Sequence, residues 1–377
     1  RVTYSDESLI ATITISAKTD PLYKYQWHLD NTGQDNFTNY PGVVSEDLRV
    51  EDRIRVGYSG SGVKVAVVDD GLEISHEDLS GNVVGGSKDF VDGDNDPTNP
   101  DPTSGHGTAV AGIIAAEGWN NKGGRGVAPS ASLVGYNYLE SQSYENLVYS
   151  FGGASDSGVI DIFNASLGGI SSGLMSVPLF DQDSYGYEQL FGTLNSQLRD
   201  GLGALIVKSS GNDFDAMVDL DNDGEADLDR LCGHGVNDRV SCVDANTDWW
   251  HHYASTMVTA ALRASGLKSS YSSPGSVVWI SGFGGEFGYD SSAYSLPDHV
   301  KGAAIMTTDK AGCESGYSNL SSQPRNAFEP GFPSDSSYRH PENQDCNYVS
   351  TMNGTSSAAP SVSGVLALML DANRNLS

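Results

Sequence analysis

The sequence predicts an α/β protein built on a doubly wound, mainly parallel β-sheet with helices on both faces. From residue 60 onward, apolar runs with the character of buried strands, such as VKVAVVD, alternate with runs of helical spacing, such as GTAVAGIIAA. This alternation is typical of parallel sheets, whose strands are joined by helical crossovers. The chain of 377 residues shows no repeat and no convincing linker, so we expect a single domain over residues 1–377, with residues 1–60 as an N-terminal extension packed on it.

The composition favours a globular protein and limits its partners. Hydrophobic residues make up 38% of the chain, and its 44 glycines indicate many tight turns. The 49 acidic residues against 21 basic ones give a formal net charge of −28, so nucleic acid is not an expected partner, because phosphate binding needs the opposite sign. Solubility, salt tolerance or cation binding explains such acidity. No membrane span is expected, since no apolar run approaches the roughly 20 residues of a spanning helix.

The predicted strands end at polar residues. Asp69 follows VKVAVV, Ser166 follows VIDIFNA, and Asn212 follows GALIVKSSG. In an open parallel sheet the ligand site lies beyond the carboxyl ends of the strands. We therefore expect these three side chains to lie around one site.

Two stretches, about residues 212–255 and 310–350, lose this alternation and are rich in Gly, Ser, Asp, Asn and Pro, which predicts long surface loops. We expect one disulfide to pin each loop. The four cysteines contain no CxxC pair, which disfavours metal clusters and favours two disulfides in an exported protein. Nearest-neighbour pairing, Cys232–Cys242 and Cys313–Cys346, is one of the three connectivities that four cysteines allow. The first twenty residues carry no signal pattern, so any export signal has been removed or never existed.

Four polar motifs follow strands or open helices: VAVVDDGL with Asp69, SGHGTAVAG with His106, VKSSGND with Asn212, and NGTSSAAP with Ser356. Acyl transfer to a hydroxyl needs a nucleophile, an imidazole that takes its proton, and a buried carboxylate that orients the imidazole. An amide beside them can stabilise the oxyanion. Each motif alone is ambiguous, because Asp, Ser and Thr are also common helix caps. Together, and in this order, they indicate nucleophilic chemistry.

In their order and residue types these motifs resemble those of the subtilisin-like serine proteases, over roughly residues 60–370. The resemblance implies a subtilisin-like fold and a secreted, extracellular serine endopeptidase that acts on polypeptides. It also implies that Ser356 is the nucleophile, His106 the general base, Asp69 its orienting carboxylate, and Asn212 the oxyanion donor.

The doublet Asp69–Asp70, followed by glycine, is similar to the kexin and furin branch, here of bacterial type. The segments KTDPLYKYQWHLDNTGQ and TTDKAGC resemble the same branch. Its members carry a β-rich P domain after the catalytic domain, whereas this chain stops at Ser377, so no P domain is expected in it. Either processing removes that domain or the protein lacks one. A propeptide or a folding chaperone is a further possible partner.

By the same resemblance, a peptide substrate binds as an added strand along Ser166, Leu167 and Gly168. The preference at P1, the residue on the amino side of the cleaved bond, stays open between basic and broad. The furin-like members carry acidic residues after the equivalent segment, but the stretch GGISSG has none.

Three other carboxylates could favour Lys or Arg in the substrate by charge pairing. Asp248, or Asp244 in the same loop, could restore a negative charge to the P1 pocket. Asp70 is expected near the P2 pocket.

Calcium is the expected cofactor, because the chain repeatedly places hard oxygen ligands at short spacing. The resemblance implies a first site with three side-chain and three backbone ligands: Asp20, Asp78 and Asn120, with carbonyl oxygens of Glu117, Lys122 and Gly124. A second candidate, VDLDNDGEADLD, matches a DxDxDG loop but has Arg230 at position twelve, where a bidentate Glu is expected. Its ligands would be Asp219, Asp221, Asp223 and Asp227. A third candidate, VDGDNDP, offers Asp92, Asp94 and Asp96.

Two other classes of protein are compatible with parts of the sequence. An inactive module that binds peptides would keep the fold, although all four catalytic positions hold competent residues. A calcium-dependent adhesive or structural protein would explain the acidic loops. A degradative subtilase of broad specificity is the alternative within the enzyme class.

Overall fold

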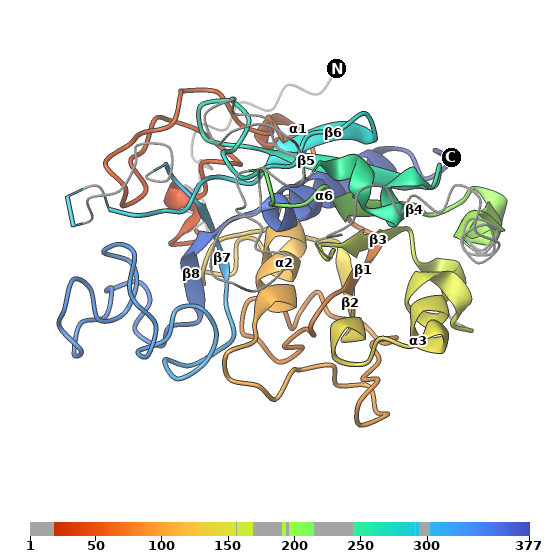
Figure 1. Ribbon diagram of the computed structural model, residues 1–377, viewed down its shortest axis with the longest axis horizontal. Helices are drawn as coiled ribbons and strands as arrows, with labels where there is room; N and C mark the ends of the chain where they lie inside the picture. Colours follow the sequence, from red (N-terminus) through yellow and green to blue (C-terminus); the bar gives the residue numbers. More distant parts are fainter. Residues whose placement is uncertain are drawn as a thin grey trace, which may run out of the picture.

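The computed structural model of the chain describes residues 19–155, 157–168, 191–193, 196–214, 244–290, 292–293 and 302–377. Its centre is a six-stranded sheet in the order β2-β1-β3-β4-β5-β6, in which every neighbouring pair is parallel (Figure 1). The strands are β1 Lys64–Val68, β2 Ser132–Tyr136, β3 Ile162–Ala165, β4 Leu205–Ser209, β5 Thr256–Leu262 and β6 Val278–Phe283. The predicted parallel α/β fold is confirmed.

Both faces of this sheet are buried, which is why its strands read as continuous apolar runs. In β1, Val65 and Val67 belong to one hydrophobic cluster, while Ala66 and Val68 belong to a second cluster on the opposite face. This alternation follows from the two-residue period of a strand. Each face therefore needs its own covering layer.

Helices provide much of those layers. The long helices α2 (His106–Ala115) and α6 (Thr355–Ala372) pack against each other, with buried residues of α2 and α6 in the first cluster (Figure 1). The short helix α3 (Tyr144–Val148) contributes Leu147 to the second cluster. The remaining described helices are short: α1 Glu51–Arg55, the π-helix η3 Tyr149–Gly153, and the 3-10 helices η1 Tyr23–Tyr25, η2 Tyr138–Glu140, η4 Ser157–Val159, η5 Arg199–Gly201, η6 Ala245–Thr247 and η7 Trp249–His252.

A two-stranded antiparallel sheet lies beside this core and carries one of the predicted loops. Its strands are β7 (Ile305–Thr308) and β8 (Tyr348–Met352), and the connection between them contains no further helix or strand. The disulfide Cys313–Cys346 closes this connection, as nearest-neighbour pairing predicts. The other predicted pair, Cys232 and Cys242, lies outside the described residues.

The segment before β1 packs onto the body of the fold. Trp27 is fully buried, and its indole nitrogen donates to the carbonyl of Ala304 at 2.7 Å. Its ring meets Phe283 edge to face, with the ring centres 5.4 Å apart. Leu22 and Leu29 are also buried, so this segment adds apolar surface to the core.

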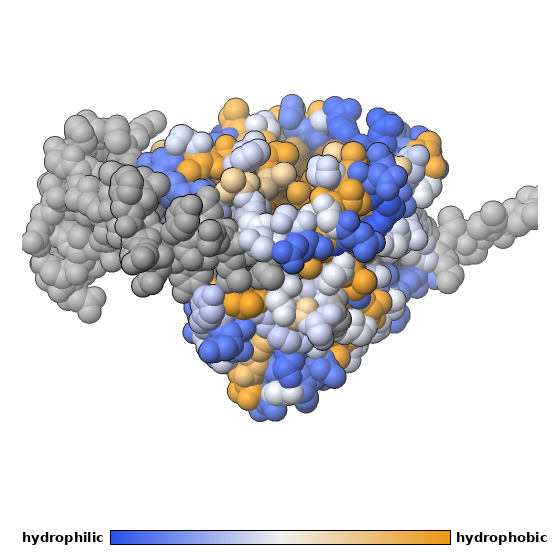
Figure 2. Space-filling model, turned by 90° about the vertical axis from the view of Figure 1, so that its right-hand side faces the viewer, coloured by the Kyte–Doolittle hydropathy of each residue, from blue (hydrophilic) through white to orange (hydrophobic). Residues whose placement is uncertain are grey.

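The described helices include none that is long and apolar enough to cross a membrane. On the face seen in Figure 2, hydrophobic residues are interspersed with hydrophilic ones over the described part of the surface.

Candidate active site

Four side chains come together beyond the carboxyl ends of the strands. Asp69 directly follows β1, and Asn212 lies three residues after β4. His106 is the first residue of α2, and Ser356 is the second residue of α6. His106, Asn212 and Ser356 line one cavity of about 310 Å³. The sheet topology thus gathers residues that are far apart in the sequence.

Asp69 and His106 form the closest polar pair of the site. The Oδ1 atom of Asp69 lies 2.7 Å from Nδ1 of His106, and it also accepts a hydrogen bond from the backbone NH of Asp70. Asp69 is fully buried, whereas the His106 side chain is 25% exposed. Burial alone would lower the pKa of His106, but the hydrogen-bonded Asp69 carboxylate, with Asp70 adding to it, raises that pKa to about 9.

Asp70 holds the chain that carries His106. One carboxylate oxygen accepts from the backbone NH of Gly107 at 2.7 Å, and the other accepts from those of Gly105 and His106 and from the Ser104 hydroxyl. These are the NH groups that a helix start leaves without partners. Both oxygens are engaged by the protein itself, which corrects the expectation that Asp70 stands free beside a P2 side chain.

Gly107 is required for this close packing. A Cβ atom there would come within 1.9 Å of the Gly71 carbonyl oxygen. The glycine after His106 therefore lets the start of α2 approach the DDG turn.

Ser356 is held by a pair of hydrogen bonds with Ser166. The Ser356 hydroxyl donates to the Ser166 carbonyl at 3.3 Å, and the Ser166 hydroxyl donates to the Ser356 carbonyl at 3.0 Å. Pro360 explains the second bond, because it lacks the NH that would otherwise reach the Ser356 carbonyl four residues earlier. In the described part of the chain no hydrogen bond joins Ser356 to His106, a contact that often forms only when substrate binds.

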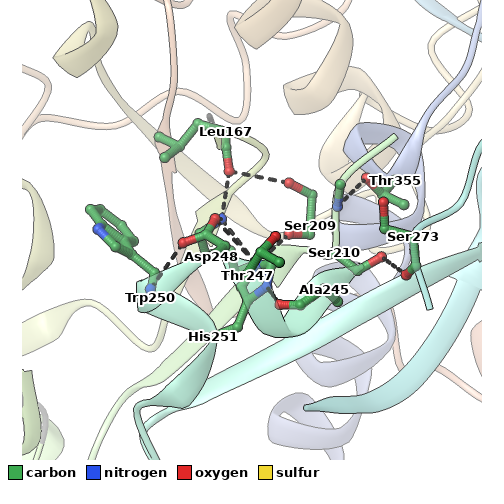
Figure 3. A network of polar contacts seen from close by, with 12 residues as sticks. Leu167, Ser209, Ser210, Ala245, Thr247, Asp248, Trp250, His251, Ser273 and Thr355 are labelled. Atoms are coloured by element: carbon green, nitrogen blue, oxygen red, sulfur yellow. Dashed lines mark hydrogen bonds and ion pairs between the residues drawn. The ribbon is translucent and has the colours of Figure 1, made fainter. Parts of the chain in front are cut away.

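Asn212 is fixed through its oxygen. Its Oδ1 accepts from the backbone NH of Thr355 at 2.8 Å and from the Thr355 hydroxyl at 2.9 Å. The Thr355 hydroxyl in turn accepts from the backbone NH of Gly211 (Figure 3). With Oδ1 so assigned, the amide nitrogen of Asn212 makes no hydrogen bond within the described residues and remains available as a donor. Thr355 and its role were missed by the sequence analysis, although the residue stands inside the NGTSS motif.

The expected substrate-binding segment lines the same cavity. Ser166, Leu167 and Gly168 all contribute to its wall. The carbonyl of Leu167 accepts from Nζ of Lys208 at 2.8 Å and from the Ser209 hydroxyl at 3.3 Å (Figure 3). Leu167 is therefore tied to β4 through its carbonyl.

Asp244 and Asp248 both line the cavity, but their carboxylates differ. Oδ1 of Asp244 accepts from the backbone NH of Asn246 at 2.8 Å, which caps η6. Oδ2 of Asp248 lies 2.9 Å from Nζ of Lys208, a buried lysine that the sequence analysis did not single out. Asp248 is thus already paired, which corrects the expectation that it supplies an uncompensated charge to the pocket.

The side chains of the first predicted calcium site converge. The amide nitrogen of Asn120 donates to Oδ1 of Asp78 at 2.7 Å, and the backbone NH of Asn120 donates to Asp20 at 3.2 Å. Oδ2 of Asp78 is buried and has no hydrogen-bond partner. A buried carboxylate oxygen without a donor, beside a second carboxylate and an amide, fits a hard cation.

The predicted backbone ligands of this site lie in the same region. Glu117 donates its NH to the Asp78 carbonyl, and Lys122 donates its NH to Asn120 Oδ1. Gly124 lies beside Gln26, and a Cβ atom added to it would meet the Gln26 amide at 2.5 Å. The described residues include no group of three or more His, Cys, Asp and Glu side chains able to hold a metal, so any cation here depends on the amide and on carbonyl oxygens.

The other two calcium candidates differ in standing. Asp219, Asp221, Asp223 and Asp227 lie outside the described residues. In the third candidate, Asp94 accepts from the NH of Asp96, and Asp96 accepts from the NH of Thr98. Each of these carboxylates serves its own turn, and the structure gives no support for a shared cation site there.

A profile of the subtilase family, Peptidase_S8, matches residues 60–377. The chain belongs to the subtilase family. It is 37% identical over 364 residues to the Aeromonas extracellular serine protease of Aeromonas sobria, covering 95% of this chain and 53% of that protein. It is 27% identical over 365 residues to a calcium-dependent protease of Trichormus variabilis, covering 93% of this chain and 44% of that protein.

Among solved structures, this subtilase is similar to the crystal structure of the Aeromonas sobria serine protease in complex with a chaperone. The TM-score is 0.79 at 35% sequence identity, and the match covers 95% of this chain and 55% of the other. The chain therefore spans about half the length of the relatives it matches.

Proposed function

We propose that this subtilase is a serine endopeptidase that cleaves polypeptides through an acyl-enzyme on Ser356. The observation that carries the proposal is the buried Asp69 carboxylate 2.7 Å from the His106 ring, at a cavity that His106 shares with Ser356 and Asn212. A hydroxyl, an imidazole with an oriented tautomer, and a free amide donor are the parts that acyl transfer needs.

In the proposed mechanism, Nε2 of His106 takes the proton of Ser356 as its hydroxyl oxygen attacks the substrate carbonyl carbon. Asp69 accepts a hydrogen bond from Nδ1 and stabilises the imidazolium that forms. The Asn212 amide nitrogen donates to the oxyanion. The C–N bond then breaks, and His106 gives its proton to the leaving amine. Water repeats these steps on the ester and releases Ser356.

Substrate binding is proposed to follow the edge segment Ser166–Gly168. An extended peptide could pair with the backbone of this segment and place its P1 side chain in the cavity. Asp244 supports a basic P1 side chain, as the DDG doublet of a kexin-like subtilase would lead one to expect. The pairing of Asp248 with Lys208 weakens that support and favours the alternative of broad specificity.

Calcium is proposed to bind at Asp20, Asp78 and Asn120. The partnerless Oδ2 of Asp78 supports this, and one relative is named a calcium-dependent protease. A bound Ca²⁺ would neutralise the two carboxylates and rigidify the segments that carry them. The acidic loop at 219–227 is proposed as a second site.

Secretion and a folding partner are proposed from the relatives. One is named an extracellular protease, and the solved structure contains a chaperone. A propeptide or a P domain is an alternative partner.

The proposed function is tested by labelling the active site. A serine-directed phosphonate should label the wild-type protein once and leave Ser356→Ala unlabelled. The same variant, folded by circular dichroism, should lose peptide cleavage. A folded wild-type protein that neither reacts nor cleaves would favour the rival hypothesis of an inactive peptide-binding module.

A further inference from the structure

The strand β4 carries a buried lysine at the end of the candidate P1 cavity. The side chain of Lys208 is 1% exposed. Its ammonium nitrogen has three acceptors: the Leu167 carbonyl at 2.8 Å, Oδ2 of Asp248 at 2.9 Å and Nε2 of His251 at 3.2 Å. An ammonium group has three protons, so these acceptors satisfy all of them. A buried charge is tolerated when it is paired and hydrogen-bonded in this way.

The third acceptor, His251, is neutral. Its Nδ1 lies 2.6 Å from the Ala245 carbonyl, the shorter of its two carbonyl contacts, so Nδ1 carries the proton and Nε2 accepts from Lys208 (Figure 3). Burial, with Lys208 adding to it, lowers the pKa of His251 to about 4. The charges of this cluster are therefore those of Lys208 and Asp248, which cancel.

The cluster forms the part of the cavity that a P1 side chain would reach. The cavity extends from Ser356 and Asn212 to Lys208 and Asp248. Lys208 and Asp248 also line a neighbouring cavity of about 440 Å³, so they stand in the wall between the two.

Gly168 allows the substrate-binding segment to touch this wall. A Cβ atom at Gly168 would lie 3.3 Å from Nζ of Lys208 and 3.5 Å from Oδ2 of Asp248. The backbone that would pair with the substrate is thus in direct contact with the ion pair.

We propose that Lys208 is a specificity-determining residue that lowers the preference of the cavity for Lys or Arg at P1. It acts in two ways: it occupies the Asp248 carboxylate that an incoming cation would use, and its own charge repels that cation. Lys208 is the only lysine or arginine among the described residues that line the cavity. Asp244 keeps its own charge, so the proposal concerns the size of the basic preference. It rests on the proposed endopeptidase function.

The test compares matched peptides that differ only at P1: lysine against its uncharged analogue norleucine, and arginine against citrulline. The ratio of kcat/KM for the charged peptide to that for the neutral one is measured for the wild type, Lys208→Met, Asp248→Asn and the double variant. Lys24→Met is the matched control, because Lys24 lies on the surface and outside the cavity. The concentration of active enzyme is determined by phosphonate titration.

Lys208→Met should raise the ratio by about tenfold or more, which is what one charge-assisted hydrogen bond provides. Asp248→Asn should lower it, because the Lys208 charge is then uncompensated. The double variant should return near the wild-type ratio, and Lys24→Met should leave it unchanged. If Lys208→Met does not fold, the fall in Asp248→Asn decides the question.

An unchanged or lower ratio in a titratable Lys208→Met enzyme overturns the proposal while leaving the endopeptidase function intact. An unchanged or higher ratio in Asp248→Asn does the same. A wild-type protein that reacts with no phosphonate and cleaves no peptide overturns both.

Discussion

Ser166 and Ser356 exchange hydrogen bonds, each hydroxyl donating to the other residue's carbonyl, at 3.0 and 3.3 Å. Ser166 follows β3, and Ser356 lies in the first turn of α6, so the exchange joins the expected substrate-binding segment to the expected nucleophile. Pro360 creates the need for it, since the Ser356 carbonyl has no NH donor within the helix. The proline that interrupts the hydrogen bonds of α6 thereby couples two parts of the site.

Replacing Ser166 by alanine should cost stability because it leaves the Ser356 carbonyl without its donor. We expect the free energy of unfolding to fall by about 1–3 kcal/mol, the cost of an unsatisfied buried polar group. Pro360→Ala restores an NH at the position that normally serves this carbonyl, so the cost of Ser166→Ala should shrink in that background. Urea unfolding in a Ser356→Ala background avoids self-cleavage. Equal costs with and without Pro360 would contradict the explanation.

The pH dependence of cleavage should reflect the Asp69–His106 pair. His106 must be neutral to act as a base, and Asp69 raises its pKa above the usual value, to about 9. Cleavage should therefore increase as the pH rises through that pKa and be lost below it. In Asp69→Asn the carboxylate is gone, so the acidic limb of the kcat/KM profile should move to lower pH, along with a fall in kcat of roughly 10⁴-fold. A wild-type acidic limb at or below pH 6.5 would count against this arrangement.

The sheet and the four polar motifs could be predicted because both leave local patterns in the sequence. Strands buried on both faces appear as short apolar runs, and Asp69 and Asn212 follow such runs directly. His106 and Ser356 stand beside glycines at helix starts, where the neighbouring residues restrict the local geometry. These features depend on residues within a few positions of one another.

The polar contacts that connect distant segments could not be predicted in this way. Lys208 meets Asp248 and His251, which lie 40 and 43 residues further along the chain, and only the folded sheet brings them together. In the sequence, Lys208 is one basic residue in an otherwise apolar strand. Asp70 was misread for a related reason, because its donors lie 34 to 37 residues away, at the start of α2. A doublet of acidic residues does not reveal which of the two serves the backbone.

Calcium removal should destabilise the protein through the site at Asp78. We expect a chelator to lower the melting temperature of the wild type by several degrees, because a ligand present at 100 times its Kd contributes about 2.7 kcal/mol. Asp78→Asn keeps the shape of the side chain but removes its charge, so the difference between calcium and chelator should shrink. Asp94→Asn is the matched control, since Asp94 serves its own exposed turn, and it should keep the full difference. Identical melting of the wild type in calcium and in chelator would contradict the site, whereas a full difference retained by Asp78→Asn would move the calcium dependence to the acidic loop at 219–227.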